Sequence, residues 1–425
     1  LPRAQCNLAW CYEYGKGVAQ DSAESYRWYR RAAEQDHPRG LFSVAHCFDY
    51  GRGVEQDSAE AVKWYQRAVD AGSAPAMCDL GVCYERGEGV EQDLGKAVGL
   101  YRRAAEAGNA AGQCNLGYLY EVGRGVEQSW QEAVRWYRAA AEQGLPRAQC
   151  NLAWCYEYGK GVEQNFKRAV HWYRQAADQE DPRGMVGMCV GCKYGRGVEE
   201  NWDEAVQWSR RAVDAGSVAA LCNLGVCYER GEGVRKDPAE AARLYRQAAE
   251  REDAAAQCNL GYLYESGEGV EQNWQEAVRW YQAAADQGYP RAQCNLGVCW
   301  EFGHGVARDP VRAAALYRQA AEGGDCVAAC NLGYLYETGS GVAQSWADAV
   351  KWYQQAVEEN YPRAQYNLAW CYEHGKGVPR DLRRARELYQ AAAQQEYEGA
   401  REAAARLEKS GGRGGFLRGF LDGLH

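Results

Sequence analysis

The chain has 425 residues, a formal net charge of −9 and an apolar fraction of 46%, so it holds ample material for a continuous core. The acidic balance argues against nucleic acid and anionic membranes as main partners, because both select clustered Lys and Arg. No stretch approaches the ~20 apolar residues of a membrane-spanning helix, so we expect no membrane span.

The motif Gly-x-Gly-Val recurs every 36 residues, from Gly15–Val18 to Gly375–Val378. Ten steps of 36 separate these copies, so the sequence contains eleven units. We number them repeats 1 to 11, with positions 1 to 36 in each and Leu1 at position 1. Such a period is typical of stacked repeat proteins, in which each unit packs mainly on its neighbours. Leu1–Val18 is identical to Leu145–Val162; because the chain begins in phase, we expect that an N-terminal part is missing.

The first half of each repeat predicts an amphipathic helix that ends at the first glycine of the motif. In repeat 4, Gly112, Leu116 and Leu119 follow the spacing of one helix face. Gly123 then ends the helix, because glycine readily adopts the left-handed backbone that commonly follows a helix. Gly125 supplies a second permissive backbone position in the tight connection.

The second helix of each repeat begins after position 21, which is Asp, Asn or Ser throughout. These residues cap helix N-termini, because their side-chain oxygens accept bonds from free backbone N–H groups. A Trp-Tyr pair at positions 28 and 29 recurs among small Ala residues, and we expect this pair in the core. Each repeat is thus two helices joined by a short Gly loop, and the fold class is an all-α solenoid. The eleven predicted caps are Asp21, Asp57, Asp93, Ser129, Asn165, Asn201, Asp237, Asn273, Asp309, Ser345 and Asp381.

The repeats occupy residues 1–396, and two further segments follow them. Residues 397–410 predict a C-terminal capping helix, more polar than the repeats because it carries Arg406 and Glu408. Residues 411–425 combine a Gly-rich linker with a short apolar tail. We favour a tail that folds back on the cap over one that docks on a partner.

The pattern Ala-x-x-x-Leu-Gly-x-x-Tyr-x-x-Gly-x-Gly-Val-x-x-Asp, followed by Ala-x-x-Trp-Tyr-x-x-Ala-Ala, resembles the Sel1-like repeat family. It is clear in Ala256–Asn273 and Ala277–Ala285. The resemblance covers residues 1–396 and implies a right-handed superhelical solenoid of antiparallel helix pairs, related to tetratricopeptide arrays. It also implies a non-enzymatic scaffold or adaptor that holds a protein or peptide partner along a concave groove.

Positions 3, 6, 10 and 13 of the first helix lie on one side, which the resemblance to tetratricopeptide arrays places in the groove. Position 10 is often aromatic, position 3 is often Arg, and position 13 is acidic except at Lys193. Aromatic residues and Arg are enriched at binding hot spots. Alternatively, the acidic row is a solvated face neutralised by Arg of neighbouring repeats, and the aromatics pack half-buried between adjacent first helices. The predicted partner-binding residues are Trp10, Glu13, Tyr118, Glu121, Arg147, Trp154, Glu157, Tyr262, Glu265, Arg291, Tyr334, Glu337, Arg363, Trp370 and Glu373.

A longer period of 144 residues, or four repeats, is superimposed on the first. Repeat 5 resembles repeat 1, repeat 7 resembles repeat 3, and repeat 8 resembles repeat 4; Gly81–Glu88 and Gly225–Glu232 are identical. Repeat 9 breaks the pattern, which indicates growth by block duplication with a later junction. A duplicated block presents the same surface again further along the chain, which permits multivalent binding.

Eighteen cysteines pose a choice between disulfides, metal ligands and core packing. Most occupy positions 6 and 11 of the first helix, which are too far apart for a bridge within one helix. Other repeats carry Phe42, Tyr366 or Leu119 at these positions, so we expect reduced cysteines that replace apolar core residues. Cys189 and Cys192 have no second pair beside them, which argues against a metal site.

Neither the six histidines nor the glycine loops form a repeated catalytic, metal-binding or phosphate-binding set. We therefore expect a protein that is not an enzyme and needs no cofactor or metal. The resemblance leaves one alternative, a cysteine-rich enzyme acting on β-lactam or cell-wall substrates, although the bridging cysteine late in the second helix is missing. A second alternative is a purely structural spacer. We expect a monomer, and the reduced cysteines favour the cytoplasm, while a missing N-terminus leaves a secreted or periplasmic location open.

Overall fold

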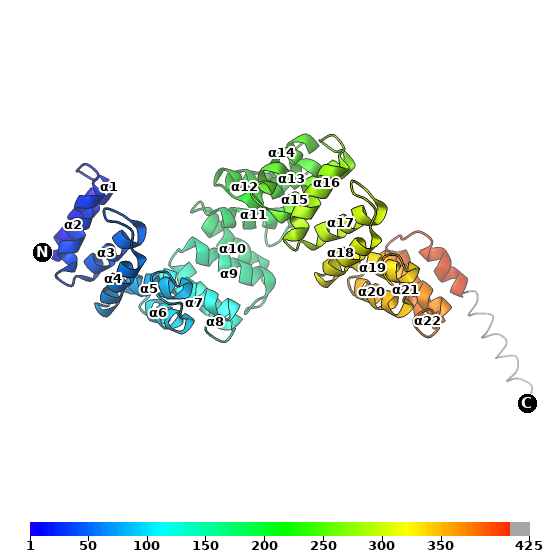
Figure 1. Cartoon of the computed structure of the whole chain (residues 1–425), viewed down its shortest axis with the longest axis horizontal. Coiled ribbons are helices and arrows are strands. Elements are labelled where there is room, and N and C mark those ends of the chain that lie inside the picture. Colours follow the sequence, from blue (N-terminus) through cyan, green and yellow to red (C-terminus); the bar gives the residue numbers. More distant parts are fainter. Residues whose placement is uncertain (409–425) are drawn as a thin grey trace, which may run out of the picture. The chain divides into compact units, whose positions relative to one another are not determined.

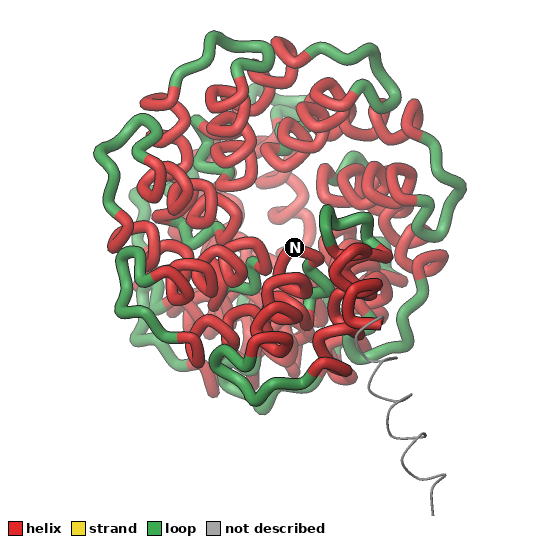
Figure 2. Tube along the Cα trace, turned by 90° about the vertical axis from the view of Figure 1, so that its right-hand side faces the viewer, coloured by secondary structure: helices red, strands yellow, loops and turns green. Residues whose placement is uncertain are grey.

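The computed structural model describes residues 1–408, in which every regular element is a helix (Figures 1 and 2). The predicted linker and tail, and the end of the predicted capping helix, lie outside the described residues. The first helices of the repeats are α1 (Pro2–Tyr14), α3 (Pro38–Tyr50), α5 (Ala74–Arg86), α7 (Ala110–Val122), α9 (Pro146–Tyr158), α11 (Pro182–Tyr194), α13 (Val218–Arg230), α15 (Ala254–Ser266), α17 (Pro290–Phe302), α19 (Cys326–Thr338) and α21 (Pro362–His374). The second helices are α2 (Ser22–Ala33), α4 (Ser58–Asp70), α6 (Leu94–Glu106), α8 (Trp130–Glu142), α10 (Phe166–Ala177), α12 (Trp202–Asp214), α14 (Pro238–Ala249), α16 (Trp274–Asp286), α18 (Pro310–Glu322), α20 (Trp346–Glu358) and α22 (Leu382–Gln394).

The predicted N-caps are confirmed in all eleven second helices, each of which begins directly after its Asp, Asn or Ser. Asp21 Oδ1, for example, accepts bonds from the backbone N–H groups of Ala23 and Glu24 at 2.9 and 3.0 Å. The first helices end as expected, with Gly15 and Gly123 at φ values of 65° and 70°. Local capping chemistry therefore defines both ends of the connecting loop.

The second glycine of the motif has a role that the sequence pattern did not reveal. A Cβ atom on Gly161 would lie 2.3 Å from the carbonyl oxygen of Trp130, in the preceding repeat. The same holds for Gly269, whose Cβ would lie 2.2 Å from the carbonyl oxygen of Pro238. Gly17, in repeat 1 of this sequence, has no atom within 4 Å of the same position. This glycine thus lets the loop of one repeat lie directly on the second helix of the repeat before it.

The chain divides into two compact bodies, Leu1–Ala220 and Leu221–His425, which we call the N-terminal and C-terminal bodies. Consecutive helices pack on each other from α1 to α12 in the first body and from α14 to α22 in the second (Figure 1). These contacts confirm the predicted all-α solenoid of helix pairs. The position-29 tyrosines, predicted as core, include the largest fully buried side chains: Tyr65, Tyr101, Tyr137, Tyr245, Tyr281, Tyr317, Tyr353 and Tyr389.

All eighteen cysteines are free and sixteen are buried, while Cys11 and Cys326 are half-buried. The prediction that the cysteines pack in the core is confirmed for these sixteen. Burial raises the pKa of Cys155 to about 12, with a smaller contribution from a nearby carboxylate. Burial, followed by the charge of Asp181, likewise raises the pKa of Cys150 to about 12. These thiols are therefore neutral packing groups at ordinary pH.

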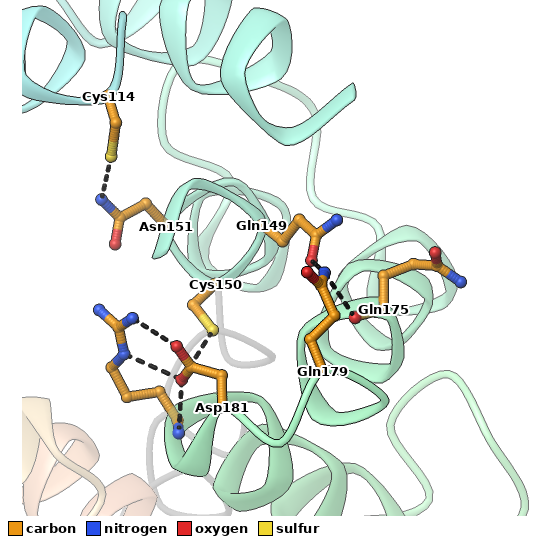
Figure 3. Close-up of polar contacts among 8 residues, drawn as sticks. Cys114, Gln149, Cys150, Asn151, Gln175, Gln179 and Asp181 are labelled. Atoms are coloured by element: carbon orange, nitrogen blue, oxygen red, sulfur yellow. Dashed lines mark hydrogen bonds and ion pairs between the residues drawn. The ribbon is translucent and has the colours of Figure 1, made fainter. Parts of the chain in front are cut away.

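Polar contacts also join successive repeats beneath the surface of the first helices (Figure 3). Asn151 Nδ2 donates to Cys114 Sγ at 3.9 Å, and the Cys150 thiol lies 3.8 Å from Asp181 Oδ1. Within repeat 5, the exposed Gln179 donates from Nε2 to Oε1 of the buried Gln149 at 3.0 Å. The interface between repeats is thus partly polar, and its polar groups satisfy one another.

A further helix, residues 400–408, follows α22. Its Ala403, Ala404 and Leu407 belong to the buried cluster of the last repeats. Arg406 of this helix reaches Glu373 Oε1 at 2.8 Å. The segment therefore covers apolar surface at the end of the array and supplies a cation to its last position-13 carboxylate.

Candidate functional site

The candidate surface is the exposed side of the first helices, which carries the predicted positions 3, 10 and 13. Five of the position-10 aromatics have 37–41% of their side chain exposed: Trp10, Tyr118, Trp154, Tyr262 and Tyr334. The sixth predicted aromatic, Trp370, is half-buried. Rings of this size that remain partly open to solvent at regular intervals can supply contact area to a partner.

Two of the tryptophans form matching clusters, one in each body. Trp154 stacks on Trp130 with 5.8 Å between ring centroids, and the Lys160 ammonium lies 5.9 Å from the Trp130 ring. Trp370 stacks in the same way on Trp346, at 5.6 Å. These rings pack between neighbouring repeats and still present an open edge.

Sequence reasoning missed the aromatic residues at position 14, which are more exposed than those at position 10. The exposed fraction is 52–60% for Tyr14, Tyr50, Tyr158, Tyr194 and Phe302. Position 14 follows position 10 by four residues, so the two side chains are neighbours on the helix. The ring centroids of Trp10 and Tyr14 lie 5.3 Å apart, and those of Trp154 and Tyr158 lie 4.9 Å apart. The sequence did carry a signal for them, because each of these aromatic residues stands directly before the first glycine of the Gly-x-Gly-Val motif.

Every position-13 carboxylate accepts a hydrogen bond from the position-29 tyrosine of its own repeat, and we call this pair the Tyr–acid clamp. The bonds measure 2.5–3.0 Å. Burial, followed by the adjacent carboxylate, raises the pKa of these tyrosines well above 10. The predicted Glu residues at position 13 are therefore held by an internal partner. The ten pairs are Tyr29–Glu13, Tyr65–Asp49, Tyr101–Glu85, Tyr137–Glu121, Tyr173–Glu157, Tyr245–Glu229, Tyr281–Glu265, Tyr317–Glu301, Tyr353–Glu337 and Tyr389–Glu373.

Repeat 6 replaces the whole clamp. It has Lys193 at position 13, Ser209 at position 29 and Cys189 at position 9, where the other repeats have Gly or Ala. A small residue at position 9 makes room for the tyrosine, since a Cβ on Gly117 would lie 2.8 Å from the Tyr137 ring. In repeat 6, Ser209 Oγ instead donates to Cys189 Sγ at 3.0 Å, and Lys193 is only 8% exposed.

In part of the N-terminal body, an Arg at position 16 of the following repeat pairs with the clamp carboxylate, and we call this the arginine cap. The tyrosine bonds Oε2 and the guanidinium approaches Oε1, so each carboxylate oxygen has its own partner. The predicted alternative, neutralisation by Arg of a neighbouring repeat, applies to these repeats. The capped pairs are Arg52–Glu13 at 3.1 Å, Arg124–Glu85 at 3.5 Å and Arg196–Glu157 at 3.3 Å.

Two of the three predicted position-3 arginines also contact the preceding repeat. Arg147 Nη2 donates to Asn115 Oδ1 at 2.7 Å, and Arg363 Nη1 donates to Asn331 Oδ1 at 3.0 Å. Arg291 is exposed. These hydrogen bonds therefore hold the guanidinium groups of Arg147 and Arg363 in place on the row of first helices before any partner binds.

Two hollows in the N-terminal body have matching linings four repeats apart. They share positions 10, 13, 14 and 29 of one repeat, positions 3, 6, 7 and 10 of the next, and positions 1 and 3 of the third. The structure thus brings together several residues that the sequence predicted only one by one. Hollow A, of about 900 Å³, includes Trp10, Glu13, Tyr14, Arg39, Phe42, His46, Tyr50 and Arg52. Hollow B, of about 480 Å³, includes Glu121, Cys150, Asn151, Trp154, Glu157, Tyr158, Arg183 and Val190.

Within residues 1–408, no group of three or more His, Cys, Asp or Glu side chains is arranged to hold a metal ion. In the same part of the chain, no helix is both long and apolar enough to cross a membrane. The chemistry that this surface offers is that of exposed aromatic rings, bonded carboxylates and arginines.

Comparison with known proteins identifies the repeat. In a comparison with curated proteins, none matches the chain. Among solved structures, the chain is similar to the protective antigen c5321 of uropathogenic Escherichia coli, which displays an SLR fold. The two share 33% identity over 96% of this chain and 88% of that one, with a TM-score of 0.68. A Sel1 repeat protein from Oxalobacter formigenes is 32% identical over 57% of this chain and 96% of its own length, with a TM-score of 0.53.

A family model described as the Sel1 repeat matches nearly the whole chain. Its eleven matches are residues 2–37, 38–73, 74–109, 110–145, 146–181, 182–217, 218–253, 254–289, 290–325, 326–361 and 362–397. Each match spans one helix pair with its glycine loop. The chain therefore belongs to the Sel1 repeat family, whose helical arrays typically mediate protein–protein interaction.

Proposed function

We propose that the protein is a non-enzymatic interaction scaffold that binds an extended segment of a protein partner on the exposed side of its first helices. The observation that carries this proposal is the recurrence of hollow A as hollow B, 144 residues further along the chain. Two hollows with the same register of side chains offer two places where one partner, or two copies of a motif, can attach.

The chemistry of the hollows favours a partner that inserts apolar or aromatic side chains. Glu13 and Glu157 already bond a tyrosine and an arginine, so they present little unsatisfied charge. The open groups are the paired rings, Trp10 with Tyr14 and Trp154 with Tyr158. Exposed aromatic side chains in concave surroundings are the usual anchors of protein interfaces.

Two attachment points on one chain increase the apparent affinity without any new contact. Once one segment of a partner is bound, the second attaches from an effective concentration set by the linker between them. Weak binding at each hollow is then sufficient for a long-lived complex. The block duplication predicted from the sequence supports this arrangement, because it explains how matching hollows arise.

The test is a binding measurement with a partner identified by crosslinking and mass spectrometry and then purified. We expect Trp10→Ala and Trp154→Ala each to weaken binding at least about tenfold, because each removes a central ring from one hollow. The matched control is Trp136→Ala, which removes a half-buried ring from α8. Circular dichroism checks that all three variants remain helical.

The Trp10→Ala/Trp154→Ala double variant decides the question. We expect it to lose more affinity than either single variant, because both attachment points are weakened. A dissociation constant within twofold of the unchanged protein would contradict the assignment of the hollows. Unchanged binding in every variant on this side of the helices would instead favour the structural spacer.

A further inference from the structure

The clamp carboxylates of three successive repeats in the C-terminal body have no arginine cap. Tyr245, Tyr281 and Tyr317 bond the Oε2 atoms of Glu229, Glu265 and Glu301 at 2.6, 2.6 and 2.7 Å. Position 16 of the following repeat, which supplies the cap to Glu13, Glu85 and Glu157, is Glu268, His304 and Ser340 in these cases. In the part of the chain that the structure describes, no Lys or Arg pairs with any of these three carboxylates.

The capped repeats show which group the free side of such a carboxylate accepts. The caps on Glu13, Glu85 and Glu157 are all guanidinium groups, and each approaches Oε1. The capping arginines remain 43–53% exposed, so they reach the carboxylate from the solvent side. An arginine of another molecule can therefore approach an uncapped carboxylate along the same path, because that path is open to solvent. Charge-assisted bonds of this type are stronger than bonds between neutral groups.

The surroundings of two of the uncapped carboxylates, Glu265 and Glu301, also favour a cationic partner. Residues 253–360 contain fourteen Asp and Glu but only six Lys and Arg, and the difference of −8 is nearly the whole formal charge of −9. Such a concentrated field attracts cations before contact. Exposed rings lie beside the carboxylates, with Tyr262 one helical turn before Glu265 and Phe302 directly after Glu301. Guanidinium groups stack on aromatic rings as well as pairing with carboxylates.

His304, which takes the place of the capping arginine opposite Glu265, is engaged elsewhere. Its ring stacks on Trp274 with 4.4 Å between centroids and also lies 6.0 Å from the ring of Phe302. It therefore adds a stacking surface beside the carboxylate instead of a fixed positive charge.

We propose that Glu229, Glu265 and Glu301 receive arginine side chains from an extended basic segment of a partner protein. These arginines take the positions that the protein's own Arg52, Arg124 and Arg196 occupy in the N-terminal body. This inference rests on the proposed scaffold function and specifies the chemistry of the partner on the C-terminal body. Because the three carboxylates occupy the same position in successive repeats, the segment carries arginines at regular intervals.

The experiment uses a fluorescent peptide of six Arg-Gly-Ser units and two matched peptides in which Lys or citrulline replaces Arg. Citrulline keeps the shape of the arginine side chain and removes its charge. We expect the Arg peptide to bind tightest, the Lys peptide more weakly because lysine lacks the planar fork, and the citrulline peptide at least tenfold more weakly than the Arg peptide. Equal binding of the Arg and citrulline peptides would overturn the proposal.

Two sets of variants assign the binding to the three carboxylates. The Glu229→Gln/Glu265→Gln/Glu301→Gln variant keeps an acceptor for each clamp tyrosine, and we expect at least tenfold weaker binding of the Arg peptide. The matched control is Glu85→Gln, which alters a carboxylate already capped by Arg124 and should leave binding within twofold. Equal losses in the triple variant and the control, or no loss in the triple variant, would contradict the assignment.

The converse variant adds arginines and removes no carboxylate. His304→Arg/Ser340→Arg supplies internal caps to Glu265 and Glu301, so we expect weaker binding of the Arg peptide by about the same factor. Unchanged binding would count against the proposal. The Trp10→Ala/Trp154→Ala variant separates the two proposals, because we expect it to lose affinity for the partner and to keep its affinity for the Arg peptide. Unchanged partner affinity in this variant contradicts the hollows alone. Unchanged Arg-peptide affinity in the triple Glu→Gln variant contradicts the role of the carboxylates alone.

Discussion

The N-terminal and C-terminal bodies share one backbone plan and differ in what faces several of their clamp carboxylates. Both have the Tyr–acid clamp, as at Glu157 and Glu265, and both have close contacts at the second glycine. Arg196 caps Glu157 in the first body, whereas His304 stands at the corresponding place opposite Glu265. The residues that build the repeat are thus kept throughout the chain, while the outward-facing positions vary. Folding and recognition are carried by different positions of the same 36-residue unit.

The largest expected effect is alkaline unfolding, which should not distinguish the bodies. Burial raises the pKa of Cys83 and Cys155 in the first body and of Cys299 and Cys371 in the second from 9 to about 12. Because the folded state favours the neutral thiol, this stability is complete below pH 9 and is lost as the pH rises towards 12. Over this range, each ionising thiol lowers the free energy of unfolding by up to ~1.4 kcal/mol per pH unit. We expect both bodies to unfold between pH 9 and 12. Circular dichroism measures the loss of helix, and hydrogen exchange shows in which body it occurs.

The control for the alkaline transition replaces thiols by a side chain that other repeats already use. Position 11 is Leu119 in repeat 4, so Cys155→Leu and Cys299→Leu keep an apolar residue at that position. Each substitution should make the transition less steep, because one titrating group is removed. A transition of unchanged steepness would show that the thiols do not drive it.

The second effect tests whether the glycine contact is equivalent in the two bodies. Gly161→Ala and Gly269→Ala should each lower the free energy of unfolding by about 3 kcal/mol, because a Cβ meets backbone atoms of the preceding repeat and φ is positive. Gly17 also has a positive φ, but no atom lies near the place of its Cβ. Gly17→Ala should therefore lower the free energy of unfolding by only ~1–2 kcal/mol. Denaturant unfolding measures the three values. Equal losses of unfolding free energy for Gly17→Ala and Gly161→Ala would contradict the role of the second glycine in packing between repeats.

The third effect concerns repeat 6, the only repeat of the N-terminal body without a clamp. Ser209→Tyr should lower stability by about 1–3 kcal/mol, because Cys189 occupies space that Gly leaves free in other repeats. Adding Cys189→Gly and Lys193→Glu should recover most of that loss by rebuilding the clamp. Denaturant unfolding of the single and triple variants gives the comparison. A triple variant less stable than the single variant would show that the three positions do not act as a set.

The sequence predicted what local chemistry determines and missed what packing between helices determines. Helix ends follow from the Asp, Asn, Ser and Gly residues near them, and the buried tyrosines follow from helical spacing. The bond between Glu13 and Tyr29 joins two helices, so it does not follow from the periodicity of one helix. Neutralisation of the acidic row by Arg of a neighbouring repeat was one predicted alternative, but the sequence did not show that position 16, as in Arg52, supplies that arginine. A signal was nevertheless present, because repeat 6 changes Cys189, Lys193 and Ser209 together.

The smallest expected effect addresses the difference between the bodies directly. Arg196→Ser removes the cap from Glu157, and Ser340→Arg offers a new cap to Glu301, so the two substitutions exchange the residue types found at position 16. Because the capping arginines are about half exposed, each change should be worth no more than ~1 kcal/mol, with stability falling in the first variant and rising in the second. Both effects should shrink in 1 M salt, which screens exposed ion pairs. Thermal unfolding at low and high salt measures them, and a salt-independent change would mean that packing, not charge, separates the two bodies. A small effect on stability beside a tenfold effect on Arg-peptide binding would indicate that position 16 is selected for recognition and not for folding.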